Sequence, residues 1–426
     1  ISIYTEDEDM PLKEVFKRIY KKEEGKPTIN HKEAANVITN YIESVVPEYD
    51  ADRVYVSDMR KMIQWYNLLL EKNMLNLEEE EEKKEETSAK EDGKKAPLFP
   101  VTDVITSSPY YEEFDLTPTA EEKAAMESEP MHGQTIKYWY DGGNCTSAPY
   151  VAQKLGLFEE CGIQTECLNG TAVKEALGTN AAQFGISHIA SLLVPITNDV
   201  NYTFIMGAHV GCKSLYVLGD SDYKSTEDLK NTRIAVPNGI GNSDYNITAR
   251  LLDKDGINPL TDVELTPVES SACVAAMQNG EISAALLSDT YAYKMVQDGT
   301  LRLVRSLLDE DFAHEPCCVV AMNNDFLNEN PVTAKKLTQC LKKASNWMRN
   351  NPEEAVNMLL DDGKIGGDYD MNLELWNTLK FGLTDEYTKA GLEQIIDDYI
   401  RLGLITSTKD ADALLEKAWH PQAPEA

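Results

Sequence analysis

Histidines and cysteines cluster near the predicted strand ends of the C-terminal two thirds of the chain. Imidazole nitrogens and thiolates are the ligands that soft transition metals prefer. The eight cysteines include no CxxC pair, and free cysteines are often simply buried as small apolar side chains. We therefore expect no metal ion and no other cofactor, and a soft metal site stays the open alternative. The residues that could form it are His188, His209, Cys212, His314, Cys317 and Cys318.

A glycine-rich turn offers a second kind of chemistry. Gly239, Gly241 and Asn242 lead from a short apolar strand at 233–236 into a helix that begins near Ser243. Backbone N–H groups and the positive end of the helix dipole could hold a carboxylate, sulfonate or phosphate there. The alternative is a structural turn, because a carboxylate at Asp244 would compete for the same dipole. No nucleophile–base pair accompanies the turn, so we expect no catalytic residues.

The elements that must position these groups alternate between strand and helix. Apolar runs predict strands at 136–140, 163–167, 183–186 and 202–206, with Thr171 capping one of the intervening helices. This alternation favours a mostly parallel sheet, whose ligands bind beyond the carboxyl ends of the strands. Within the first strand, either Trp139 or the pair Tyr138 and Tyr140 can face a ligand. The side chains expected to converge at the strand ends are Asn144, Cys145, Thr146, Ser187, His188, His209 and Cys212.

The order of the later elements predicts two lobes. The strand at 214–218 leaves the first sheet, a second α/β lobe follows, and the strand at 316–322 returns. We assign residues 134–215 and 310–421 to lobe 1 and residues 216–309 to lobe 2. A cleft between lobes joined in this way is a hinge-closing binding site.

The N-terminal third differs from this pattern. Residues 1–75 predict a small helical module, with Pro11 at the start of the first helix, Asn30 and Glu33 forming a capping box for the second, and Ser57 capping the third. Residues 76–133 predict a disordered acidic low-complexity linker, and the prolines of residues 96–133 are expected to break any helix there.

The charge of the chain excludes some partners. The formal net charge is −32, while hydrophobic residues make up 42% of the sequence, enough for real cores. Such an acidic surface repels nucleic acid and anionic membranes, and no run approaches the roughly 18 apolar residues of a membrane span. We expect neither a nucleic-acid partner nor membrane insertion. No signal peptide is visible in the sequence, which begins at Ile1.

Residues 134–421 resemble the solute-binding proteins of ABC importers, in the group that binds nitrate, sulfonates, taurine and thiamine precursors. The resemblance implies a bilobed periplasmic-binding-protein fold of type II with two crossover strands. It also implies a monomer outside the cytoplasm, with an ABC permease as partner. Residues 1–75 resemble a bacterial domain family of unknown function. The segments that carry the two resemblances are 152–163, 228–239, 277–286 and 301–306 in the first, and 3–16, 47–58 and 65–69 in the second.

The resemblance also implies where a ligand binds. In this family the contacts come from the loops that correspond to 142–147, 187–188, 239–243 and 288–291 here. Relatives often carry Trp-x-Pro in the last loop, whereas this chain has Ser288, Asp289 and, two residues on, Tyr291. The departure favours a small polar ligand, and the acidic residue disfavours a simple anion. We therefore expect a receptor for a sulfonate-, amino-acid- or pyrimidine-like solute. The alternative is a metal-dependent enzyme or metallochaperone that uses the His/Cys set.

Overall fold

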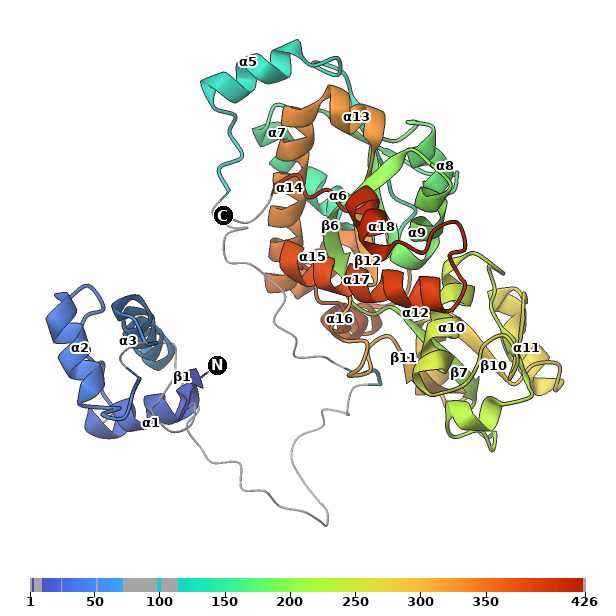
Figure 1. Ribbon diagram of the computed structural model, residues 1–426, viewed down its shortest axis with the longest axis horizontal. Helices are drawn as coiled ribbons and strands as arrows, with labels where there is room; N and C mark the ends of the chain where they lie inside the picture. The colour runs from blue at the N-terminus through green and yellow to red at the C-terminus, as the bar shows by residue number, and fades with distance from the viewer. Residues whose placement is uncertain are drawn as a thin grey trace. The chain divides into compact units, whose positions relative to one another are not determined.

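The computed structural model describes residues 2–3, 10–23, 25–50, 53–71, 98–100 and 114–423. The chain divides into two compact units, residues 1–93 and 94–426 (Figure 1). Most of the predicted acidic linker, residues 76–97 and 101–113, lies outside the described residues.

The N-terminal unit contains a short hairpin and three helices. Strand β1 (Ser2–Ile3) pairs antiparallel with β2 (Met10–Pro11), and α1 (Leu12–Lys22), α2 (Ala35–Glu43) and α3 (Val56–Glu71) follow. Apolar residues at helical spacing form its core, including Phe16, Ile38, Ile42, Ile63 and Tyr66.

Two of the helix caps predicted for this unit are wrong. Helix α2 follows Ala34, which makes no side-chain cap, and the side chain of Asn30 instead accepts a hydrogen bond from the backbone N–H of Lys32. Helix α3 already begins at Val56, so Ser57 lies inside the helix. A cap depends on the backbone conformation of a single residue, which a sequence pattern specifies poorly.

The expectation that prolines prevent a helix within residues 96–133 is also wrong. Helix α5 (Ala120–Ser128) begins after a capping box formed by Thr119 and Glu122. It belongs to the C-terminal unit, because Met126 is buried in the main core and Glu129 accepts hydrogen bonds from the first turn of α14 (Pro331–Asn350). The prolines bound this helix rather than break it.

The first sheet of the C-terminal unit has the strand order β4-β3-β5-β12-β6. Its strands are β3 (Ile136–Trp139), β4 (Thr165–Leu168), β5 (Phe184–His188), β6 (Tyr202–His209) and β12 (Cys318–Asn323). Strands β4, β3 and β5 are parallel, whereas β12 runs antiparallel to both β5 and β6. Strands β4, β3, β5 and β6 therefore share one direction, as the prediction of a mostly parallel sheet requires, and the returning strand β12 alone opposes them.

Helices pack around this sheet. One of them corrects the predicted cap at Thr171, because α8 begins after Ala172 and has no side-chain cap. The helices from the first half of the sheet are α6 (Ala148–Lys154), α7 (Leu157–Glu160), α8 (Val173–Gly178) and α9 (Ile189–Thr197). Those after β12 are α13 (Asn324–Glu329), α14, α15 (Pro352–Asp361), α16 (Tyr369–Thr378), α17 (Asp385–Arg401) and α18 (Ala411–Ala418).

The second sheet has the order β11-β7-β10-β8-β9 and is mixed in the same way. Figure 1 shows β7, β10, β11, α10 and α11 grouped apart from the first-sheet elements. The strands are β7 (Lys213–Leu218), β8 (Arg233–Ala235), β9 (Glu264–Thr266), β10 (Ala284–Ser288) and β11 (Leu301–Ser306). The helices are the 3-10 turn η1 (Thr226–Leu229), α10 (Ser243–Lys254), α11 (Ser270–Gln278) and α12 (Asp289–Gln297).

Two crossovers join the sheets. The chain passes from β6 to β7 through residues 210–212 and returns from β11 to β12 through residues 307–317. The prediction of two α/β lobes connected twice is therefore confirmed. Strand β6 extends to His209, so this residue ends a strand instead of lying in the following loop. Among the described residues, no helix is long and apolar enough to cross a membrane.

Candidate functional site

A cavity of about 350 Å³ lies between the two sheets. Lobe 1 contributes the loop after β3 and the end of β5, lobe 2 contributes the start of α12, and Cys212 lies in a crossover between them. The cavity brings together most of the residues predicted for the site, and that they bind a ligand stays a prediction. These residues are Asn144, Cys145, Thr146, Ser187, His188, Cys212, Ser288 and Asp289.

Other predicted residues do not line the cavity. His209 is completely buried, and Tyr291 is 42% exposed on the surface of α12. The glycine-rich turn at Gly239, Gly241, Asn242 and Ser243 also lies outside the lining.

Sequence reasoning missed one wall of the cavity. Leu375 and Thr378 of α16, with the following Leu379, line it from the helical segment that comes after β12. No local motif marks these residues, because they lie far along the chain from every predicted ligand loop. Of the two alternatives that strand alternation left open, Trp139 lines the cavity, and Tyr138 and Tyr140 do not; Trp139 also donates its indole N–H to the carbonyl of Thr171.

Two buried acceptors in the lining have no hydrogen-bond partner among the described residues: Asn144 Oδ1 and Asp289 Oδ2. The amide orientation of Asn144 is fixed by Asn372, which donates its own N–H groups to the carbonyls of Gly366 and Asp368. Asn372 Oδ1 must therefore accept from Asn144 Nδ2, at 2.9 Å. The oxygen of Asn144 remains as an unpaired acceptor.

The second acceptor belongs to a carboxyl group. Asp289 Oδ1 accepts a hydrogen bond from the hydroxyl of Tyr216 at 2.6 Å, while Oδ2 has no partner in the described part of the chain. Burial raises the pKa of Asp289 to about 6, although hydrogen bonds from Tyr216 and Ser214 oppose the shift. Among the described residues that line the cavity, none is a lysine or an arginine.

Six histidine and cysteine side chains gather beside the cavity, and we call them the hinge cluster; three of them, Cys145, His188 and Cys212, line the cavity. The geometry follows from the sheet: β12 runs antiparallel to its neighbours, so Cys318 at its start pairs with His188 and His209 at the ends of β5 and β6. Predicted residue His314 is exposed and lies outside the cluster. The hinge cluster consists of Cys145, His188, His209, Cys212, Cys317 and Cys318.

Its members contact one another closely. The Cys317 sulfur lies 3.5 Å from the Cys212 sulfur and 3.3 Å from His188 Nδ1, and the Cys318 sulfur lies 3.7 Å from the same nitrogen. Burial alone would raise the pKa of Cys317, but hydrogen bonds from Cys212 and Cys318 lower it to about 6. The backbone of Cys212 has φ +96°, a conformation that is uncommon for residues other than glycine.

Comparison with known families identifies both units. The model of the "NMT1/THI5 like" family matches residues 145–355, and that of a domain of unknown function, DUF6852, matches residues 1–69. The C-terminal unit contains an NMT1/THI5-like domain. Its sequence is 26% identical over 238 residues to a "putative binding protein" of Brucella abortus (strain 2308), covering 53% of this chain and 69% of the relative.

Solved structures share the fold of the NMT1/THI5-like domain. The alkanesulfonate-binding protein SsuA from Xanthomonas axonopodis pv. citri, bound to MOPS, superposes with a TM-score of 0.52 at 16% identity, over 67% of this chain and 97% of that chain. The periplasmic nitrate-binding protein NrtA from Synechocystis PCC 6803 gives a TM-score of 0.54 at 14% identity, over 67% and 86%. The predicted bilobed periplasmic-binding fold is therefore confirmed.

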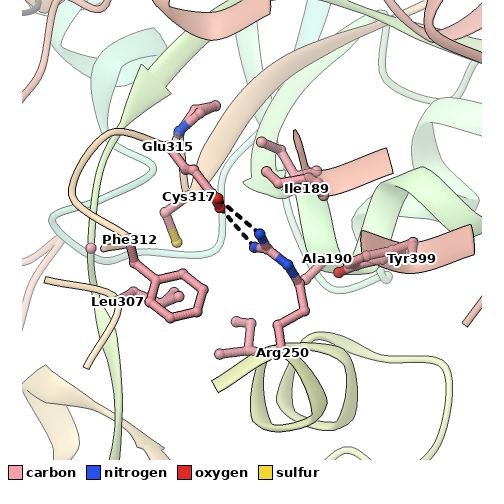
Figure 2. Close-up of a pocket in the computed structure, with 12 residues that line it drawn as sticks. Ile189, Ala190, Arg250, Leu307, Phe312, Glu315, Cys317 and Tyr399 are labelled. Atoms are coloured by element: carbon pink, nitrogen blue, oxygen red, sulfur yellow. Dashed lines mark hydrogen bonds and ion pairs between the residues drawn. The ribbon is translucent and has the colours of Figure 1, made fainter. Parts of the chain in front are cut away.

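A buried ion-pair network joins the two lobes of the NMT1/THI5-like domain. Arg250 of α10 points toward Glu315 in the returning crossover (Figure 2) and forms ion pairs of 2.8 Å with both Glu315 and Asp398 of α17. Burial alone would raise the pKa of Asp398, but a hydrogen bond from Arg401 and the charge of Arg250 hold it below its usual value. A cavity of only about 30 Å³ remains beside these groups, lined in part by Cys317.

The glycine-rich turn holds its own carboxylate. Asp244, 1% exposed, accepts hydrogen bonds from the backbone N–H of Asn238 at 2.9 Å and from its side-chain amide, and pairs with Lys213. Asn242 in turn accepts a hydrogen bond from Lys174 of lobe 1 at 3.4 Å. The position that an anionic ligand would occupy is therefore filled by a side chain of the domain.

Proposed function

We propose that the NMT1/THI5-like domain is the solute-binding component of an ABC importer and captures a small polar molecule between its lobes. One observation carries the proposal: a cavity of about 350 Å³ lies between two sheets joined by two crossovers and is lined by both lobes. Hinge closure around a guest requires this arrangement. The named relatives support the same class of function, since they include a binding protein, an alkanesulfonate binder and a nitrate binder.

The lining favours a ligand that carries hydrogen-bond donors. Asn144 Oδ1 and Asp289 Oδ2 are buried acceptors without a hydrogen-bond partner among the described residues, which is energetically unfavourable. An amine or amidine group on the ligand would donate hydrogen bonds to both oxygens. A free sulfonate would add a negative charge beside Asp289, and no described lining residue supplies a lysine or arginine to balance it. Among the expected solute classes, an amino-acid- or aminopyrimidine-like molecule therefore fits best.

Capture without turnover fits the placement of the reactive thiol. Cys317 and His188 form a thiol–imidazole contact of 3.3 Å, an arrangement that nucleophilic catalysis can use. The Cys317 sulfur, however, belongs to a residue that is 8% exposed and lines the small cavity rather than the solute cavity.

A receptor of this kind acts as a monomer outside the cytoplasm and delivers its ligand to a permease.

A binding screen tests the proposal. The full chain is mixed with amino acids, aminopyrimidines and alkanesulfonates, and its melting temperature and binding heat are measured. A ligand present at about 100 times its Kd should stabilise the fold by about 2.7 kcal/mol. Asp289→Asn should weaken an amine ligand by at least tenfold, whereas Asp222→Asn, at an exposed position of the same lobe, should not change its affinity. Conversion of any of these molecules by the protein would overturn the receptor proposal.

A further inference from the structure

The hinge cluster contains two overlapping groups of metal-ligating atoms. One ring nitrogen of His188 and the sulfurs of Cys212, Cys317 and Cys318 lie within 4.8 Å of one another, and so do the donor atoms of Cys145, His209 and Cys212. We propose that the hinge cluster binds one thiophilic d¹⁰ cation, Zn²⁺ or Cu⁺, beside the solute cavity. The proposal stands apart from solute import, because metal binding requires neither a second ligand nor a permease.

The spacing of the first group suits a tetrahedral ion. With Zn–S bonds of about 2.3 Å and Zn–N bonds of about 2.0–2.1 Å, neighbouring ligand atoms lie about 3.5–3.8 Å apart. The measured separations are 3.5 Å between the sulfurs of Cys212 and Cys317, and 3.3 and 3.7 Å from His188 Nδ1 to the sulfurs of Cys317 and Cys318. The other separations within the group lie below 4.8 Å, so shifts of up to about one ångström would bring all four ligand atoms onto the ion. Three thiolates and one imidazole are the ligand set of many structural zinc sites.

His209 supplies an independent observation. Its Nδ1 lies 2.9 Å from the carbonyl oxygen of Val210 and donates its proton there, which leaves Nε2 as a lone-pair acceptor. Nε2 is completely buried and has no hydrogen-bond partner among the described residues. Buried polar groups are nearly always satisfied, and metal-ligating histidines typically donate their other N–H to a carbonyl or carboxylate. An ion bound by the second group, with Cys145 and Cys212, would satisfy this nitrogen. Because both groups use Cys212, they are alternative positions for the one ion.

Because the hinge cluster lies where the two lobes are joined, an ion bound there would connect the segments that link them. Cys212 lies in the crossover that leaves the first sheet, and Cys317 ends the crossover that returns to it. The returning crossover is also joined to the end of β6 by a hydrogen bond from the N–H of Cys317 to the carbonyl of His209. An ion bound by both cysteines would tie together the two segments about which the lobes move. Cys145, His188 and Cys212 also line the solute cavity, so the ion would lie next to the solute.

The test measures metal binding by the full chain, purified under reducing conditions without chelator. Mass spectrometry of the native protein should find one ion per chain, and titrations of the metal-free protein with Zn²⁺ or, under anaerobic conditions, with Cu⁺ against a competing chelator identify which of them binds more tightly. Substitution with Co²⁺ should produce thiolate-to-cobalt charge-transfer absorption. Cys212→Ser, which removes the ligand common to both groups, should lower the affinity by more than about 100-fold.

A matched control keeps the test specific. Cys273 is a buried thiol in lobe 2 that donates to the carbonyls of Val268 and Glu269, and Cys273→Ser should bind the ion as the unaltered protein does. His209→Asn should weaken binding by about 10- to 100-fold if the ion occupies the second group, and His188→Asn should do so if the ion occupies the first. A reduced protein that binds neither ion, or a Cys273→Ser variant that loses as much affinity as Cys212→Ser, would overturn the metal site. Solute binding by the metal-free protein would leave the receptor proposal intact in that case.

Discussion

The start of α10 and the hinge cluster are neighbouring regions, because Lys213, which pairs with Asp244 of α10, follows Cys212 of the cluster directly in the chain. Their buried polar groups nevertheless differ: those at α10 have partners, and one in the hinge cluster does not. At α10, Asp244 is fully partnered by Lys213 and by the backbone and side-chain amides of Asn238. In the hinge cluster, His209 Nε2 has no partner in the described chain, and the thiol groups contact mainly one another and the imidazoles. The first region is complete without a ligand, whereas the second gains most from one.

This difference changes which of the two sequence features, the glycine-rich turn or the set of histidines and cysteines, indicates a binding site more strongly. A glycine-rich turn before a helix is a familiar anion-binding motif, but here the internal carboxylate of Asp244 already accepts the backbone N–H and the side-chain amide of Asn238. The cysteines and histidines show no recognised spacing, but the sheet gathers their donor atoms into two groups, each with its atoms within 4.8 Å of one another. The inventory of unsatisfied buried atoms therefore separates a structural turn from a binding site better than the motif does.

The largest expected effect comes from removing the carboxylate that completes the α10 region. Asp244→Asn leaves the Lys213 ammonium, whose side chain is 12% exposed, without its counter-ion. Breaking a buried pair in this way costs about 3–5 kcal/mol of the free energy of unfolding. Urea unfolding followed by circular dichroism measures the loss, and Asp222→Asn should stay within about 0.5 kcal/mol of the unaltered protein.

The same variant also reopens the position that a ligand anion would use. Sulfate should therefore restore part of the stability of Asp244→Asn and should have a smaller effect on the unaltered protein. A loss below about 1 kcal/mol, with no response to sulfate, would show that the α10 region does not depend on its internal carboxylate.

Much of the fold follows from local pattern, because apolar runs bounded by polar turns specify strands. The predicted runs at 136–140 and 202–206 became β3 and β6, and the crossovers followed from the order of elements. Single-residue features failed where backbone conformation decides them: the caps expected at Thr171 and Ser57 are absent, and α5 forms between prolines. Hydrogen bonds from α14 to Glu129, at the end of α5, are tertiary contacts that no local pattern contains.

In the candidate site, too, some features follow from local sequence pattern and others depend on tertiary contacts. The convergence of Asn144, Ser187 and His188 follows from the rule that ligands bind at the carboxyl ends of strands. The wall formed by α16 could not be predicted, nor could the orientation of the Asn144 amide, which depends on Asn372, 228 residues further along the chain. Contacts of that length depend on the packing of helices after β12, which amphipathic periodicity alone does not determine.

The second prediction applies the same substitution to Asp289, a buried carboxylate of the solute cavity whose Oδ2 has no partner in the described chain. The pKa of Asp289 rises from 3.8 to about 6, so the folded state disfavours its ionised form. The penalty is absent below about pH 4, grows as the pH rises to about 6, and is then constant. Asp289→Asn should therefore raise the free energy of unfolding by about 2–3 kcal/mol at pH 7.5, at 1.36 kcal/mol per unit, and by much less at pH 4.

Thermal melting of both proteins across this pH range checks the sign. The two aspartate variants should differ in direction as well as in size, since Asp244→Asn destabilises and Asp289→Asn stabilises. A stability gain that is equal at pH 4 and pH 7.5 would mean that ionisation of Asp289 is not its cause.

The smallest effect concerns the backbone of the hinge cluster itself. Cys212 has φ +96°, which glycine adopts freely and serine does not. Cys212→Gly and Cys212→Ser both remove the thiol. The difference between their free energies of unfolding therefore reports the contribution of the backbone conformation. The glycine variant should be more stable by about 0.5–1 kcal/mol, measured on metal-free protein by urea unfolding, while both variants lose metal affinity. A glycine variant that is less stable than the serine variant would contradict this prediction. It would indicate that the packing of a side chain at residue 212 outweighs the cost of its backbone conformation.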